Sequence, residues 1–173
     1  MTALETQGLA AKCAARVLAV AGAAEKNAAL EAIAQALCLH QDAILAENQK
    51  DLDAARAGGM KQSLLDRLAL SPQRIAGIVE GVRQVAALPD PVGEVTRMTR
   101  RPNGLIIGKR RVPLGVIGII YEARPNVTVD AAALCLKSGN AVILRGGKEA
   151  FRSNQAFVSV MRSALETAGL PED

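Results

Sequence analysis

Apolar residues recur at helical spacing through the first half of the chain. One such face comprises Ala29, Leu30, Ile33, Ala34 and Leu37. Positions three or four residues apart share one side of a helix, so this pattern predicts a helix with a buried face. The next segment, AILAENQKDLDAARAGG, keeps this character and ends at Gly58 and Gly59, a plausible helix terminus. Ser71 as N-cap and Pro72 at the first helical position open a further helix, which closes before the prolines of PDPVG. We therefore expect a helical lead-in over residues 1–90.

The pattern changes after residue 90, where Thr, Val and Ile become frequent. Pro102-Asn103-Gly104 lies at the centre of the segment EVTRMTRRPNGLIIGKRRV. Asn-Gly between two β-like runs is a strong signal for a two-stranded hairpin. The sequence thus predicts strands at about 94–101 and 105–112, within a hairpin region at 91–112.

Many basic residues fall in this predicted hairpin: Arg97, Arg100, Arg101, Lys109, Arg110 and Arg111. One interpretation is a solvated hairpin whose charged edges discourage aggregation. A second is a contact between subunits. A nucleic-acid-binding ribbon is disfavoured, because base reading needs more than positive charge and because only 2% of the chain is aromatic, which leaves little for base stacking.

The last third alternates short apolar runs with helical segments. Val116–Ile120 and the NAVILR segment are expected to be strands buried on both faces. The segments after them read as helices, with Thr128 and Ser153 as the expected N-caps. The order strand, helix, strand, helix over 114–170 predicts a parallel βαβ unit with a right-handed crossover.

The predicted fold class is therefore α/β: N-terminal helices, a β-hairpin and, over residues 113–173, the first βαβα units of a Rossmann-like domain. All three regions would form one incomplete cofactor-binding domain. Two parallel strands make a poor sheet on their own. We therefore expect the chain to be the N-terminal portion of a longer protein, or a truncated form of one, with an open sheet edge that lowers solubility.

Cations and glycines follow the second predicted strand, where Arg145, Gly146, Gly147 and Lys148 come in sequence. Ligands of open parallel sheets bind beyond the carboxyl ends of the strands. Glycines let a backbone approach a ligand closely, and cations suit phosphate or carboxylate groups. The alternative interpretation is an ordinary strand-to-helix turn that carries surface charges.

Other features narrow the class of protein. The chain has a formal net charge of +4, with its basic excess after residue 90. No apolar run is long enough for a transmembrane helix and no signal peptide is evident, so we expect a cytoplasmic protein without membrane contacts.

Cys13, Cys38 and Cys135 lack metal-ligand spacing and are expected to be free thiols packed in the core or between helices. The single histidine, His40, is expected at the surface or at a helix cap.

The segment VPLGVIGIIYEARPNVTVDAAALCLKSGNAVILRGGKEAFRSN closely resembles the γ-glutamyl phosphate reductases, also called glutamate-5-semialdehyde dehydrogenases, of the aldehyde dehydrogenase superfamily. YEARPN and SGNAVILRGGKEA are specific to that branch, whereas PLGVIGII and AGLP occur more widely. ILAENQKDLDAAR in the helical part also fits, so the resemblance covers essentially the whole chain. Another enzyme of the superfamily is disfavoured because YEARPN replaces the more usual Trp-Asn-Phe-Pro pattern.

The resemblance implies an NADPH-dependent reduction of L-glutamyl 5-phosphate to L-glutamate 5-semialdehyde and phosphate, the second step of proline biosynthesis from glutamate. A cysteine attacks the acyl phosphate, and the resulting thioester is then reduced. That cysteine lies beyond residue 173 in the family, and Cys135 does not correspond to it. No catalytic residue is therefore assigned here, and the chain alone is expected to be inactive. The alternative is a non-catalytic remnant that binds nucleotide or pairs with other chains.

The resemblance also implies roles for individual residues. Arg145 occupies the place of a lysine that lies beside the adenosine ribose in aldehyde dehydrogenases, and Lys148 would favour a 2′-phosphate and so NADPH over NADH. Asn126 is the nearest candidate for an asparagine that stabilises the oxyanion. Arg124 could meet the substrate carboxylate or the acyl phosphate. Glu122 could contact substrate, or pair with Arg124 and only fix the loop. The hairpin at 94–112 would contribute to contacts within a homo-oligomer.

Overall fold

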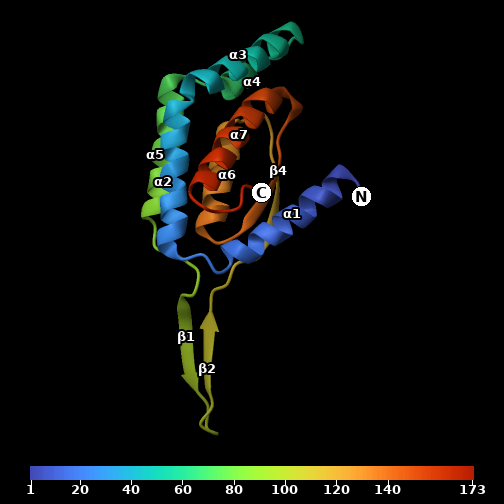
Figure 1. Ribbon diagram of the computed structural model, residues 1–173. Coiled ribbons are helices and arrows are strands. Elements are labelled where there is room, and N and C mark those ends of the chain that lie inside the picture. The colour runs from blue at the N-terminus through green and yellow to red at the C-terminus, as the bar shows by residue number, and fades with distance from the viewer.

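The computed structural model describes all residues from Met1 to Asp173 (Figure 1). Five helices come first: α1 (Ala3–Leu18), α2 (Ala23–Leu39), α3 (Gln41–Ala57), α4 (Gln62–Leu68) and α5 (Pro72–Ala87). An antiparallel pair follows, β1 (Val95–Arg100) and β2 (Ile106–Arg110). The chain then runs through β3 (Val116–Ile120), α6 (Asn126–Lys137), β4 (Ala141–Arg145), a 3₁₀ turn η1 (Lys148–Ala150) and α7 (Phe151–Thr167). The predicted order of helices, hairpin and βαβα units is thus confirmed.

The helical lead-in forms as its local signals indicate. Ser71 caps α5 by accepting a hydrogen bond from the Arg74 N–H, and Pro72 occupies the first helical position. The apolar face predicted within α2 is fully buried. Together with residues of α1, α5, α6, β4 and α7, this face forms one continuous aliphatic core. Phe157 of α7 is the aromatic residue within it.

The parallel sheet contains only β3 and β4. The two strands pair in register from Val116 opposite Ala141 to Ile120 opposite Arg145. The prediction that both strands are buried on both faces is wrong: the residues of β3 alternate between exposed and half-buried, and in β4 only Ala141 is fully buried. Ile120 is 85% exposed, because β3 has a single neighbouring strand and few helical contacts.

Two predicted helix caps are also wrong. Helix α6 begins at Asn126 after Pro125, so Thr128 lies within its first turn and is buried. Helix α7 begins at Phe151, and Ser153 is likewise a buried residue of the first turn. Both hydroxyl groups bond to distant side chains instead of capping their own helices.

The start of α7 is capped by Asp51 from α3. One carboxylate oxygen of Asp51 accepts the Ser153 N–H at 2.8 Å and the Ser153 hydroxyl at 2.7 Å, and the other accepts the Arg152 N–H at 3.3 Å. Asn48, one turn earlier on α3, donates to the Ser153 hydroxyl oxygen at 3.0 Å and to the Leu68 carbonyl at 2.9 Å. A negative charge at a helix N-terminus is stabilising. This buried network therefore fastens the helical lead-in to the α/β part.

The three cysteines are all free, but their burial differs. Cys135 on α6 is buried, as expected, whereas Cys13 and Cys38 are exposed. The core assignment is therefore wrong for those two, because the core of α1 and α2 is formed by other positions of each helix. His40 lies exposed at the junction of α2 and α3, where its backbone N–H closes α2.

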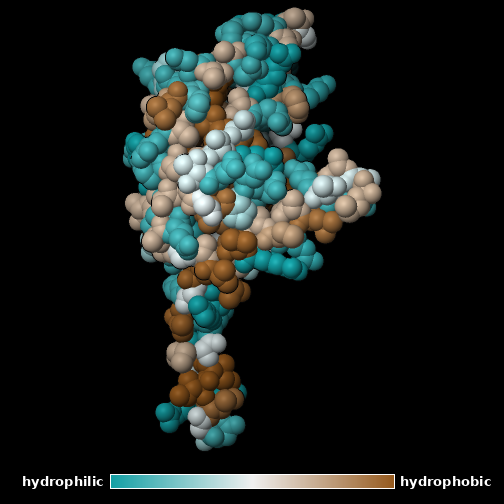
Figure 2. Space-filling model, in the orientation of Figure 1, coloured by the Kyte–Doolittle hydropathy of each residue, from teal (hydrophilic) through white to brown (hydrophobic).

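The hairpin of β1 and β2 projects from the body of the molecule (Figure 1). Gly104 in its turn has a φ of 87°, a conformation that favours glycine. Apolar side chains remain exposed along it, visible as the brown atoms below the body in Figure 2: Val95, Met98, Leu105, Ile106 and Ile107. None of the seven helices combines the length and hydropathy of a membrane span.

A buried ion pair lies near the base of the hairpin. Lys26 of α2 is fully buried, and its Nζ lies 2.7 Å from a carboxylate oxygen of Asp90. Burial raises the pKa of Asp90, but hydrogen bonds from Lys26 and from the Val92 N–H outweigh this and leave the pKa below its ordinary value. Lys137 of α6 donates to the Ala86 carbonyl at 2.7 Å. These contacts hold the connection between α5 and β1 against the core.

The cap supplied by Asp51 gives a stability prediction. Asp51→Ala should lower the free energy of unfolding by about 2–3 kcal/mol, because the buried donors at Ser153 lose a charged acceptor. Urea denaturation followed by circular dichroism measures this change. Asp53→Ala on the same helix is the control, since Asp53 is exposed and its ion pair with Arg56 lies at the surface. Equal stability of the two variants would contradict the capping role.

Candidate cofactor and substrate site

Two loops meet at the carboxyl ends of β3 and β4. Ile120 pairs with Arg145, and the Tyr121 N–H continues the ladder by donating to the Arg145 carbonyl at 3.1 Å. A Cβ built on Gly147 would lie 3.3 Å from the Ala123 nitrogen, so the second loop packs directly on the first. The sheet therefore brings residues 121–124 and 145–148 to one edge, as parallel topology predicts.

Arg145 and Lys148 both present exposed side chains at this edge. Neither takes part in an ion pair, although six ion pairs occur elsewhere in the structure. Their positive charges are therefore not neutralised by a carboxylate of the chain. Two such cations beside a glycine turn suit an anionic ligand.

The packing of this turn requires glycine at position 146. A Cβ on Gly146 would overlap Nδ2 of Asn154 and lie 3.1 Å from the Tyr121 hydroxyl oxygen. A Cβ on Gly147 would lie 2.7 Å from a carboxylate oxygen of Glu149. A side chain at Gly146 would therefore push the turn away from Tyr121, whereas the Glu149 side chain near Gly147 is flexible and can move aside.

A chain of hydroxyl and amide groups fixes the first loop. Thr128 donates its single hydroxyl proton to the Asn154 carbonyl oxygen at 2.9 Å, so the Tyr121 hydroxyl, 2.6 Å away, donates to Thr128. Burial raises the pKa of Tyr121, which keeps its hydroxyl group protonated and able to donate. The end of β3, the start of α6 and the start of α7 are thereby held together.

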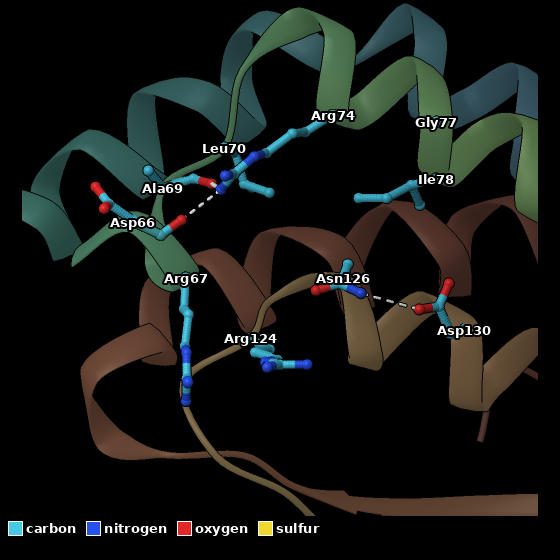
Figure 3. A pocket seen from close by; sticks show the side chains of 10 residues that line it. All are labelled: Asp66, Arg67, Ala69, Leu70, Arg74, Gly77, Ile78, Arg124, Asn126 and Asp130. Atoms are coloured by element: carbon cyan, nitrogen blue, oxygen red, sulfur yellow. Dashed lines mark hydrogen bonds between the residues drawn. The ribbon is translucent and has the colours of Figure 1, made fainter. Parts of the chain in front are cut away.

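A polar pocket of about 540 Å³ lies between this first loop and the helical lead-in (Figure 3). Its lining residues are Asp66, Arg67, Ala69, Leu70, Arg74, Gly77, Ile78, Arg124, Asn126 and Asp130. Two of the three predicted substrate-binding residues, Arg124 and Asn126, thus line one pocket. Glu122 does not.

Glu122 and Arg124 are linked only through the backbone, where the Arg124 N–H donates to the Glu122 carbonyl at 2.8 Å. Their exposed side chains form no ion pair with each other. The interpretation in which Glu122 fixes the loop by pairing with Arg124 is therefore wrong. The Arg124 guanidinium remains available within the pocket.

Asn126 is tied to Asp130 one turn later on α6. Nδ2 of Asn126 donates to Oδ2 of Asp130 at 3.0 Å. Burial raises the pKa of the Asp130 carboxyl group, and the hydrogen bond from Asn126 opposes this rise. One of the two N–H groups of Asn126 is therefore already used within the chain.

Sequence reasoning missed four polar residues of the pocket: Asp66, Arg67, Arg74 and Asp130. Arg74 donates to the backbone carbonyls of Asp66 and Ala69, so it closes the end of α4. The spacing of four residues between Asn126 and Asp130 could have indicated a shared helix face. No sequence signal connects α4 to the loop after β3, because this contact is set by tertiary packing.

The packing of the glycine turn gives a prediction. Gly146→Ala should destabilise the chain by about 1–3 kcal/mol, because the added methyl group overlaps Asn154 and displaces Tyr121. Gly118→Ala on β3 is the control, since its Cβ would meet nothing within 4 Å. Thermal unfolding of both variants compares them. Equal melting temperatures would show that the turn is not packed as described.

Comparisons with known proteins agree on one family. The chain is 61% identical to the γ-glutamyl phosphate reductase of Moorella thermoacetica, over 98% of this chain and 40% of that protein. It is 62% identical to the protein of that name from Carboxydothermus hydrogenoformans, over 94% of this chain and 39% of that protein. No family model matches the chain.

Solved structures give the same result. The crystal structure of γ-glutamyl phosphate reductase from Thermotoga maritima superposes with a TM-score of 0.96 at 46% identity, over 99% of this chain and 41% of that one. The Saccharomyces cerevisiae structure has a TM-score of 0.93 at 31% identity, over 99% of this chain and 45% of that one. A probable aldehyde dehydrogenase from Listeria monocytogenes shares the fold, with a TM-score of 0.66 at 17% identity. This chain spans about 40% of the length of the curated relatives it matches, and by sequence and fold it belongs to the γ-glutamyl phosphate reductase family.

Proposed function

We propose that this chain supplies cofactor- and substrate-binding residues of a glutamate-5-semialdehyde dehydrogenase. The whole enzyme would reduce L-glutamyl 5-phosphate to L-glutamate 5-semialdehyde and phosphate in proline biosynthesis. The observation that carries the proposal is the edge where residues 121–124 and 145–148 meet beside a polar pocket. The names of the relatives support the reaction, and its biosynthetic character supports a cytoplasmic location.

The cofactor role falls on the turn after β4. Aldehyde dehydrogenase relatives support a nicotinamide cofactor in general. Arg145 and Lys148 fit its phosphorylated adenosine portion, because both cations are exposed and have no carboxylate partner. Lys148 would bind the 2′-phosphate that distinguishes NADPH from NADH, and the backbone of Gly146 and Gly147 would face the ligand. When bound, NADPH supplies the hydride for the reduction.

Substrate contacts fall on Arg124 and Asn126. The Arg124 guanidinium is a planar fork that can bind a carboxylate or phosphate with two hydrogen bonds. Asn126 keeps one amide N–H beyond the one held by Asp130, and this group can donate to a substrate oxygen. Glu122 does not line the pocket, so it would contact the substrate from the part of the loop outside the pocket.

None of the three cysteines is suited to the nucleophilic role. None lines the pocket, and burial raises the pKa of the Cys135 thiol and so disfavours the reactive thiolate. Cys13 and Cys38 lie on the outer faces of α1 and α2. The nucleophile must therefore come from outside these 173 residues, and we expect no turnover from this chain alone.

The hairpin supports a second function, contact between chains. Exposed apolar residues on both faces of the hairpin, including Met98, Ile106 and Ile107, favour contact with another protein surface. We propose that the hairpin at 94–112 pairs subunits of a homo-oligomer. A non-catalytic remnant that pairs with other chains would use this surface, whereas one that binds nucleotide would use the turn after β4.

The cofactor assignment is tested by titrating the chain with NADPH and with NADH. Arg145→Ala and Lys148→Ala should each weaken NADPH binding about tenfold, because each removes a charged contact to phosphate or ribose. Lys148→Ala should affect NADH less. Arg101→Ala in the hairpin is the control and should leave both affinities unchanged. Wild-type affinity in both site variants would refute the cofactor role of this turn.

A further inference from the structure

The pocket between α4 and the loop after β3 carries both signs of charge. Arg67 and Arg124 supply cations, and Asp130 supplies a half-buried carboxylate. A carboxylate on the pocket wall would repel a bound phosphate, because both groups are negatively charged. A pocket that binds only phosphate is therefore not expected to contain one. A ligand with a cation and an anion on one carbon atom would satisfy both kinds of group.

Asp130 has capacity for another hydrogen bond. Its only hydrogen bond comes from Asn126 to Oδ2, so Oδ1 accepts none from the chain. The residue lies in the second turn of α6 on the pocket wall, with Asn126 beside it (Figure 3). The bond with Asn126 also holds the carboxylate in one orientation. A partly buried, oriented carboxylate is well suited to accept from an ammonium group.

The arginines of the pocket differ in their availability. Arg74 donates to two backbone carbonyls and is committed to the end of α4. The side chains of Arg67 and Arg124 make no hydrogen bond or ion pair with the chain. Figure 3 shows Arg67 pointing away from its helix and Arg124 lying below Asn126. Arg124 is the nearer of the two to Asn126 and Asp130 along the loop and helix that carry them.

We propose that this pocket recognises the α-amino acid end of the substrate. Asp130 accepts the α-ammonium group, and Arg124 binds the α-carboxylate. Arg67 adds positive charge at the α4 side of the pocket. This inference rests on the proposed function, and it makes Asp130 the residue that distinguishes a glutamyl compound from a dicarboxylate of the same length.

Three soluble probes test the inference on the 173-residue chain: L-glutamate, glutarate, which lacks the α-ammonium, and 4-aminobutyrate, which lacks the α-carboxylate. Amide shifts in ¹H–¹⁵N spectra report binding. L-glutamate should perturb residues 124–130 and bind at least about tenfold more tightly than either analogue, because each analogue loses one charged contact.

Two variants assign the contacts. Asp130→Asn should weaken L-glutamate about tenfold and leave glutarate unchanged, whereas Arg124→Gln should weaken both. Asp66→Asn is the matched control, since it makes the same charge change at the same pocket while its carboxylate is held by Gln62. Thermal unfolding of each variant separates lost binding from lost folding.

The inference is overturned if glutarate binds as tightly as L-glutamate, if L-glutamate fails to perturb residues 124–130, or if Asp130→Asn behaves like Asp66→Asn. Titration with NADPH separates this result from the proposed function. If the chain binds NADPH normally and one of these outcomes is observed, the pocket assignment is wrong but the proposed function is not contradicted. Failure of the wild-type chain to bind NADPH contradicts the proposed function itself.

Discussion

The in-register pairing of β3 with β4 is the constraint on which the site depends. Because Ile120 lies opposite Arg145, the segments that leave the two strands must start side by side. The bond from the Tyr121 N–H to the Arg145 carbonyl extends this pairing one step beyond the strands. A shift of one residue would turn every side chain of a strand to the other face and separate the two loops.

The helical lead-in does more than cover the sheet. Asp51 of α3 caps α7, and Asn48 joins Ser153 to the end of α4. These bonds place α4 and its Arg67 against the loop that carries Arg124. The pocket therefore exists only where the lead-in and the α/β part meet.

Much of this arrangement could be predicted from sequence. Local signals gave the helix starting at Pro72, the Asn103-Gly104 turn and the strand-helix alternation, because each depends on neighbouring residues. The caps at Thr128 and Ser153 were predicted wrongly, since their hydroxyl groups bond to partners on other elements. The pocket residues of α4 were missed for the same reason. Contacts between segments some 60 residues apart leave no periodic or compositional trace.

We propose that residues 121–124 and 145–148 form one binding edge for a phosphorylated nucleotide. The most direct measurement is a ¹H–¹⁵N titration of the chain with adenosine 2′,5′-bisphosphate, compared with adenosine 5′-monophosphate. If both loops bind the nucleotide, their amides shift together along one binding curve, and the bisphosphate binds more tightly. Shifts confined to the hairpin, or to one loop without the other, would contradict it.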